Sequence, residues 1–152
     1  MGKRILLNSL YDVNNRAQKG HPEIRILLVD SNTGFLRLTS NFLLRSLKDA
    51  VISKARNVEA ALAQAEEHHP RVILLELSMP DRSGIELISR LREMLPKAGI
   101  IVLTTLDADV YRKVALAAGA EEFVAKANLT AELLPAIQKV CGEIRLQTDH
   151  RE

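Results

Sequence analysis

Five short apolar runs recur along the chain, and each is separated from the next by a segment with helical spacing. Three of the runs are nearly continuous Ile, Leu and Val, which is typical of strands buried on both faces of a parallel sheet. The second and fifth runs are shorter and more mixed, and this composition favours edge strands. The runs cover residues 24–30, 50–55, 71–77, 99–105 and 121–126.

Helical spacing of apolar residues fills the intervening segments. The first predicted helix, 33–47, places Phe35, Leu38, Phe42 and Leu43 along one side. The others cover residues 58–69 after the N-cap residue Asn57, 84–95 before Pro96, 109–118 before Gly119, and a segment beginning near Thr130. Because Pro135 lacks a backbone donor, we expect the regular part of the last helix to begin there or to bend.

Alternating strands and helices predict a doubly wound α/β domain with right-handed crossovers. In such a sheet the functional crevice lies at the carboxyl ends of the strands. The polar residues that close the runs are Asp30, Glu76, Thr104 with Thr105, and Lys126. We therefore expect two carboxylates, a pair of hydroxyls and an ammonium group to converge on one rim.

The length of 152 residues allows one ordinary domain. We assign residues 24–146 to it, residues 1–23 to a loose N-terminal extension, and residues 147–152 to a polar tail or the start of a linker. The single cysteine, Cys141, excludes an internal disulfide and is interpreted as a packing residue.

The composition narrows the range of partners. No apolar run approaches the roughly 20 residues of a membrane-spanning helix, and the N-terminus does not form a signal peptide, so a cytoplasmic protein is expected. The net charge is only +2, the basic residues are dispersed, and there is no Trp to stack on bases. We do not expect this domain to bind nucleic acid or a membrane.

Four segments resemble the receiver domain of response regulators, including the chemotaxis regulators, in the order and spacing of that family. They read "RILLVDS", "VILLELSMPDRSGIEL", "IIVLTT" and "GAEEFVAK". The most specific features are the turn from Met79 and Pro80 to Gly84, and Lys126 after a Gly-Ala pair and an aromatic residue. The resemblance covers residues 24–146 and implies a flavodoxin-like (βα)5 fold with strand order 2-1-3-4-5.

The resemblance also implies roles for the residues of the rim. In the family, an Asp after the third strand attacks a phosphodonor, and acidic residues after the first strand hold Mg²⁺ against the phosphoryl oxygens. Carried over residue by residue, Glu76 takes the phosphoacceptor position, Asp30 is one of the acids, and Thr104 and Lys126 contact the phosphoryl group. Phe123 takes the position of the switch aromatic, although an aromatic residue there also serves as core packing.

Two positions depart from the family pattern, and both belong to its chemistry. Glu76 replaces the phosphoaccepting Asp, and Ser31 replaces the second acid, which in the family is the direct metal ligand; Ala127 also replaces a common Pro. Asp30, Glu76 and the carbonyl of Ser78 are the remaining candidates for Mg²⁺, which we expect them to bind weakly or not at all.

These departures lead to the hypothesis of an atypical, degenerate receiver whose pocket is closed by its own side chains. The longer Glu76 carboxylate would pair with Lys126 and approach Thr104 without phosphorylation. Such a protein is not an enzyme and signals by docking to a sensor histidine kinase or another signalling protein. Two alternatives stay open: a working phosphoaccepting receiver in a phosphorelay, and the receiver part of a transcription regulator whose DNA-binding domain is absent from this chain.

The resemblance implies an output surface as well. In the family, the fourth helix, fifth strand and fifth helix form the usual dimer and docking face. Here that face would include Val110, Tyr111, Val114, Phe123 and Leu134. A homodimer or a docked partner is therefore expected on this side.

Overall fold

The computed structural model describes residues 23–80, 83–105, 108–142, 144, 146 and 147. Strands and helices alternate through this part of the chain, as the pattern of apolar runs predicts. The elements are β1 (Ile24–Val29), α2 (Thr33–Ser46), β2 (Ala50–Ala55), α3 (Val58–His68), β3 (Val72–Leu75), α4 (Gly84–Met94), β4 (Gly99–Thr104), α5 (Ala108–Ala118), β5 (Glu122–Ala125), the 3₁₀ turn η1 (Lys126–Asn128) and α6 (Leu129–Cys141).

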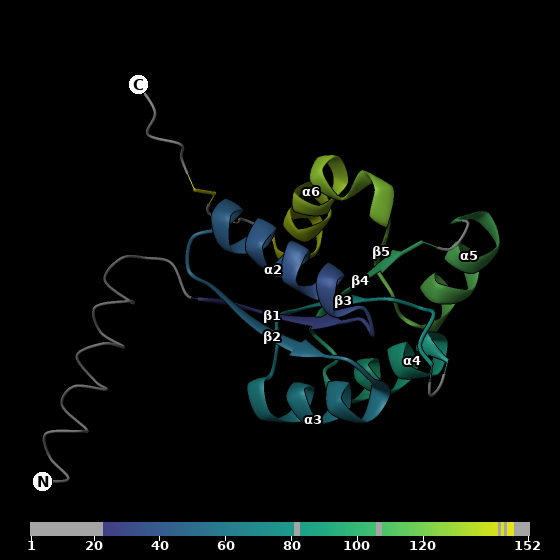
Figure 1. The fold of residues 1–152 in the computed structure, drawn as a ribbon. Coiled ribbons are helices and arrows are strands. Elements are labelled where there is room, and N and C mark those ends of the chain that lie inside the picture. Colours follow the sequence, from purple (N-terminus) through teal and green to yellow (C-terminus); the bar gives the residue numbers. More distant parts are fainter. Residues whose placement is uncertain (1–22, 81–82, 106–107, 143, 145, 148–152) are drawn as a thin grey trace, which may run out of the picture.

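The five strands form one parallel sheet in the order β2-β1-β3-β4-β5, which confirms the predicted fold class (Figure 1). The two strands of mixed composition, β2 and β5, are the edges of the sheet. In the register of the sheet, Val29 of β1 lies beside Leu75 of β3, and Leu75 lies beside Val102 of β4. The carboxyl ends of the central strands therefore meet at one edge.

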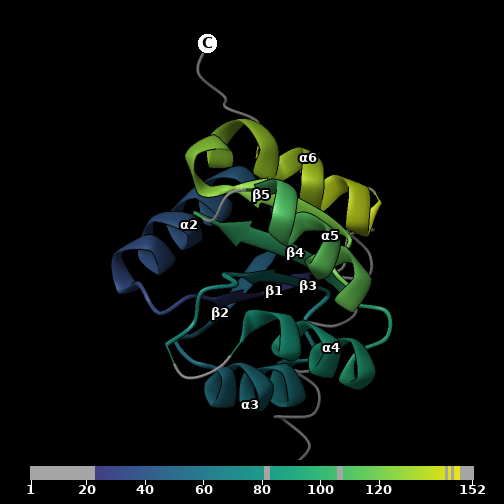
Figure 2. The same cartoon turned by 90° about the vertical axis from the view of Figure 1, so that its right-hand side faces the viewer.

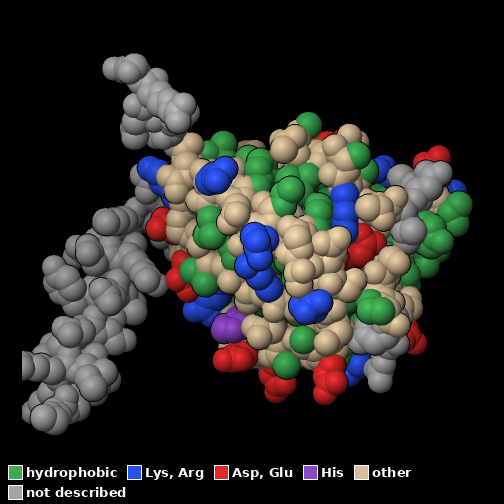
Figure 3. All heavy atoms as spheres, viewed as in Figure 1, with side chains coloured by type: hydrophobic (Ala, Val, Ile, Leu, Met, Phe, Trp, Pro, Cys, Tyr) green, Lys and Arg blue, Asp and Glu red, His purple; other side chains and the backbone are tan. Residues whose placement is uncertain are grey.

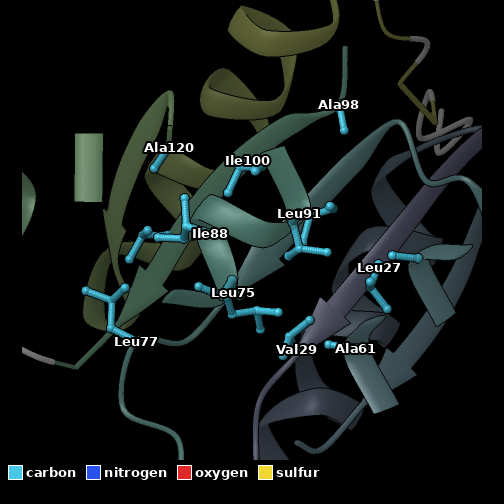
Figure 4. Close-up of a cluster of buried hydrophobic side chains, with 14 of the residues drawn as sticks. Leu27, Val29, Ala61, Leu75, Leu77, Ile88, Leu91, Ala98, Ile100 and Ala120 are labelled. Atoms are coloured by element: carbon cyan, nitrogen blue, oxygen red, sulfur yellow. The ribbon is translucent and has the colours of Figure 1, made fainter. Parts of the chain in front are cut away.

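Helices cover both faces of the sheet (Figure 2). The pleat sends alternate side chains of each strand to opposite faces. Ile73 and Leu75 pack in the core beneath α3, α4 and α5, whereas Val72 and Leu74 pack beneath α2 and α6. Figure 4 shows the first of these cores, where side chains of β1, β3 and β4 meet those of α3 and α4. The near-continuous Ile, Leu and Val of the central strands thus reflects burial on two sides.

Two details of the helices differ from the expectations. Leu38 is 57% exposed, because the buried side of α2 is centred on Leu36 and Leu43. The last helix begins at Leu129 and runs through Pro135, so the first alternative, a regular helix that begins at Pro135, is wrong, and the second, a bend, stays a prediction. The burial of apolar side chains on both sides of the proline offsets the loss of one backbone donor.

The turn after β3 is held by close backbone approach. A Cβ on Gly84 would lie 2.6 Å from both the Cα and the carbonyl oxygen of Leu77. The amide of Gly84 donates to that same carbonyl at 3.1 Å. Only glycine fits here, and the contact fixes the path of the chain between β3 and α4.

The ends of the chain were predicted to be an extension and a tail. Residues 1–22 of the predicted extension lie outside the described part of the chain, as do residues 148–152. Gln147, the first residue of the predicted tail, donates from its backbone amide to the carbonyl of Ser46 at 2.8 Å. Within the described residues, no helix is long and apolar enough to span a membrane.

Candidate functional site

Two acidic residues sit directly beyond the central strands. Asp30 follows β1 and Glu76 follows β3, and each is only 4% exposed. The amide of Asp30 donates to the carbonyl of Ala55 at 3.0 Å, and the amide of Glu76 donates to that of Val29 at 2.9 Å. The hydrogen-bond ladder of the sheet thus extends one residue past the strands and holds both backbones beside one another.

The Glu76 carboxylate is held by three groups from different parts of the chain. The hydroxyl of Thr104, a fully buried residue at the end of β4, donates to Oε1 at 2.5 Å. The backbone amide of Ser78 donates to the same oxygen at 3.0 Å. Nζ of Lys126 lies 3.1 Å from Oε2. The contacts with Lys126 and Thr104 that the extra methylene of Glu predicts are both present.

Lys126 joins the two carboxylates. Its Nζ donates to Oδ2 of Asp30 at 2.6 Å while it pairs with Glu76. Lys126 is the first residue after β5, and its side chain is 13% exposed. The ammonium group also lies 4.1 Å from the centre of the Phe35 ring, a cation–π distance. The lysine is therefore positioned by two anions and one aromatic face.

The charges of this site do not balance. Two buried carboxylates share one ammonium group. The remaining oxygen of Asp30, Oδ1, accepts the amide of Asn32 at 2.9 Å, so each of the carboxylate oxygens faces a hydrogen-bond donor or the ammonium. Charge-assisted hydrogen bonds to backbone amides and to Thr104 stabilise the excess negative charge.

The donor set can be tested for Mg²⁺, which requires near-octahedral oxygen ligands, with one or two carboxylates supplied by the protein. Lys126 already lies between the carboxylates of Asp30 and Glu76, where it supplies the positive charge. Ser78 contacts Glu76 through its amide. Among the described residues, no group of three or more acidic, His or Cys side chains is placed to hold a metal. A bound Mg²⁺ would have to compete with the Lys126 ammonium for the same two carboxylates.

The other predicted site residues are not all brought together. Ser31 is half-buried, and Thr105 is exposed at the bend after β4, outside the contacts of Glu76 and Lys126. Phe123 is 7% exposed and packs in the core beneath α5, with the guanidinium of Arg112 5.6 Å from its ring centre. The burial of Phe123 confirms its packing role, while its places as the switch aromatic and on the docking face stay predictions.

Phe35 is the site residue that sequence reasoning missed. It was expected only as an apolar residue of the first helix, yet its ring faces the ammonium of Lys126. Its amide donates to Oδ1 of the N-cap residue Asn32 at 3.0 Å, which places it in the first turn of α2, close to the rim. The one available signal was its position five residues after Asp30.

Residues 26–138 match the family model of the response regulator receiver domain. The chain belongs to this family. It is a receiver domain of a two-component response regulator, and its strand order is that of the chemotaxis regulator fold. Glu76, Lys126 and Thr104 meet beyond the carboxyl ends of the strands, and their roles in a receiver pocket stay predictions from the resemblance.

Individual relatives agree with the family. The chain is 29% identical to the response regulator protein VraR of Staphylococcus aureus over 118 residues, 76% of this chain and 56% of VraR. The BeF3-activated receiver domain of DrrB matches with a TM-score of 0.71 at 25% identity, covering 80% of this chain and 99% of DrrB's. A response regulator from Burkholderia pseudomallei, solved with a phosphorylated aspartic acid, calcium ion and citrate, matches with a TM-score of 0.71 at 28% identity. The match covers 76% of this chain and 67% of that one. The chain thus spans about half the length of the curated relatives it matches.

Proposed function

We propose that this receiver signals by docking to other proteins, with a pocket closed by its own side chains in place of phosphorylation. The observation that carries the proposal is the position of Glu76 between Lys126 and Thr104. By the family resemblance, these are the two residues that would contact the phosphoryl group. Here a permanent carboxylate already satisfies both.

The same contacts work against phosphoryl transfer. A carboxylate attacks a phosphodonor through a free oxygen in near-attack geometry, and errors of about 1 Å cost orders of magnitude in rate. Oε1 of Glu76 is held by Thr104 and Ser78, and Oε2 faces Lys126. The absence of an acid at Ser31 and the position of Lys126 further weaken Mg²⁺ binding. The domain therefore has neither a free nucleophile nor a strong metal site, and we do not assign it enzymatic activity.

The surface of α5 supports docking. Val110, Tyr111 and Val114 are 75%, 41% and 49% exposed, and Val114 lies about one helical turn after the other two. Exposed apolar residues in such a row favour a protein partner. The proposed partners are a sensor histidine kinase, another signalling protein, or a second copy of this chain, in the cytoplasm. Lys and Arg side chains are spread singly over the face in Figure 3, with acidic ones along its lower rim over α3. Nucleic acid is not among the proposed partners, because the net charge is only +2 and the basic residues are dispersed along the sequence.

The test is the intact mass of the protein after incubation with a small acyl-phosphate donor and Mg²⁺. Wild type is expected to gain no phosphoryl group. Glu76→Asp, which shortens the side chain and frees the acceptor, serves as the matched comparison. A gain by Glu76→Asp alone would identify Glu76 as the only block. Phosphorylation of the wild type would refute the proposal and leave a phosphoaccepting receiver in a phosphorelay.

One observation favours a second candidate, the receiver part of a longer transcription regulator with a separate DNA-binding domain. The chain spans 56% of VraR, and the part of VraR beyond the match is long enough for a further domain. A structural relative from Aurantimonas sp. SI85-9A1 is a two-component response regulator of the LuxR family. It is 26% identical to this chain, with a TM-score of 0.71, and the match covers 81% of this chain and 89% of that one. The mass of the native gene product, measured with an antibody against this domain, distinguishes the candidates: a product much larger than 16.9 kDa supports the second.

A further inference from the structure

Thr39 is a buried polar residue of α2 that the site described above does not use. It is 2% exposed, and among the described residues its hydroxyl has no hydrogen-bond partner. A buried hydroxyl without a partner is destabilising relative to a hydrogen-bonded one. Buried polar groups in native proteins are therefore nearly always satisfied by protein or by an ordered water.

A small cavity lies beside Thr39, between α2 and the sheet. About 10 Å³ of it is open to the centre of a water molecule, which is roughly the space that one water needs. Its walls are mainly apolar, from Leu28, Leu74 and Leu103, with Phe35 at one side. Besides Thr39, the polar residues that line it are Asp30 and Glu76. The cavity thus joins the hydroxyl of α2 to the acidic end of the pocket.

Glu76, which also lines this cavity, carries a second incompletely satisfied atom. Its Oε2 is buried, and although Nζ of Lys126 lies 3.1 Å away, the pair does not have hydrogen-bond geometry. Continuing the alternation of β3, Glu76 lies on the same side of the sheet as Leu74, the side that α2 covers. Oε2 is therefore a buried anionic acceptor on the side of the sheet where Thr39 lies.

We propose that one water molecule occupies this cavity and bridges the Thr39 hydroxyl to Oε2 of Glu76. The water donates one O–H to the carboxylate and exchanges a second hydrogen bond with Thr39, so both incompletely satisfied atoms are paired. A site of this kind needs room for one water and at least two polar partners, and both conditions are met. Thr39 is then a positioning residue for Glu76. The inference rests on the proposed function, because it requires Glu76 to hold its closed position.

The bridge makes α2 a part of the pocket. Lys126 and Thr104 hold Glu76 from the β4 and β5 side of the sheet, and the water holds it from α2. Removing the hydroxyl should therefore shift the carboxylate even though Thr39 does not touch it. This consequence separates positioning from simple packing.

The experiment compares Thr39→Val, which keeps the shape and removes the hydroxyl, with Thr39→Ser, which keeps the hydroxyl. The readout is the ¹³C resonance of the Glu76 side-chain carboxyl carbon, assigned by its loss in Glu76→Gln. Ser40→Ala is the matched control, because Ser40 is a buried hydroxyl residue of the same helix that does not line the cavity. We expect Thr39→Val to move the resonance and to lower Tm by about 2–4 °C, while Thr39→Ser and Ser40→Ala leave the resonance in place.

An unmoved Glu76 resonance in Thr39→Val would overturn the proposal, as would a raised Tm, since replacing an unpartnered hydroxyl by a methyl group is neutral or stabilising. Should Thr39→Val not fold, a high-resolution crystal structure of the wild type decides the matter. Density for a water within hydrogen-bond distance of both atoms supports the bridge, and a dry cavity refutes it. The proposed function is tested separately: it fails if the wild type gains a phosphoryl group in the intact-mass measurement described above.

Discussion

Lys126→Met should be one of the most destabilising single substitutions in this domain. The change removes the ammonium group and keeps most of the apolar stem. It leaves the carboxylates of Asp30 and Glu76 facing one another, with side chains only 6% and 4% exposed. It also removes the cation from the face of Phe35. Two like charges then share a buried site without a counter-ion, which is the costly half of a buried ion pair.

The magnitude follows from burial. Removing one partner of a buried pair costs about 3–5 kcal/mol, because the other partner stays desolvated. A matched surface pair shows the contrast: Nζ of Lys139 lies 3.1 Å from Oε1 of Glu122, but the lysine side chain is 74% exposed. Exposed pairs contribute about 0–1 kcal/mol, so Lys139→Met should have a small effect. The difference between the free energies of unfolding of Lys126→Met and Lys139→Met measures how much burial adds to the cost of losing the ammonium group.

The assay is urea unfolding of the wild type and both variants, monitored by far-ultraviolet circular dichroism. The free energies of unfolding are compared only if their slopes against urea concentration are equal. Glu76→Gln in the Lys126→Met background should recover part of the loss, because one of the two unpaired charges is removed. If Lys126→Met and Lys139→Met were equally stable to within about 0.5 kcal/mol, the closed pocket described above would be refuted.

Two further predictions concern the turn after β3 and the last helix. Gly84→Ala should lower the free energy of unfolding in urea by about 1–3 kcal/mol, because its Cβ would lie 2.6 Å from the backbone of Leu77. Gly34→Ala is the control and should cost little, because its Cβ would meet only the Asn32 side chain, at 3.3 Å. Burial raises the pKa of the Cys141 thiol, partly countered by nearby Arg71. Alkylation by iodoacetamide at neutral pH should therefore be much slower in the native protein than in urea. Because the native pKa is the higher one, stability should also fall as the pH rises past the pKa of the unfolded thiol.

The fold was predictable because the signals in this chain agree with one another. The central strands are buried on both faces, so their Ile, Leu and Val runs stand out from the helices around them. The cap at Asn57 was also readable, and its side chain accepts the amide of Ala60 at 2.7 Å. Leu38 and Pro135 were misjudged for one reason. Spacing alone does not fix the rotation of a helix or its first turn, which depend on the packing of neighbouring elements.

The site was predictable as far as the sheet positions it. Asp30, Glu76, Thr104 and Lys126 each follow or end a strand, and parallel strands bring their carboxyl ends together. Phe35 reaches the site from α2, where no strand register applies, and it was missed. Thr105 was expected in the pocket, but it lies exposed at the bend after β4, whereas Thr104, the last residue of β4, is buried and donates to Glu76.

On the function proposed above, a single methylene closes the pocket and sets this receiver apart from one with Asp at position 76. A shorter Asp at position 76 would reach less far from β3 and leave Thr104 and Lys126 for a phosphoryl group. The longer Glu76 reaches both, at 2.5 and 3.1 Å, and still accepts the amide of Ser78. Any attack by Glu76 must first break these contacts in a buried site, where each lost partner leaves a desolvated charge or hydroxyl. The interactions that stabilise the pocket are therefore the same ones that oppose its phosphorylation.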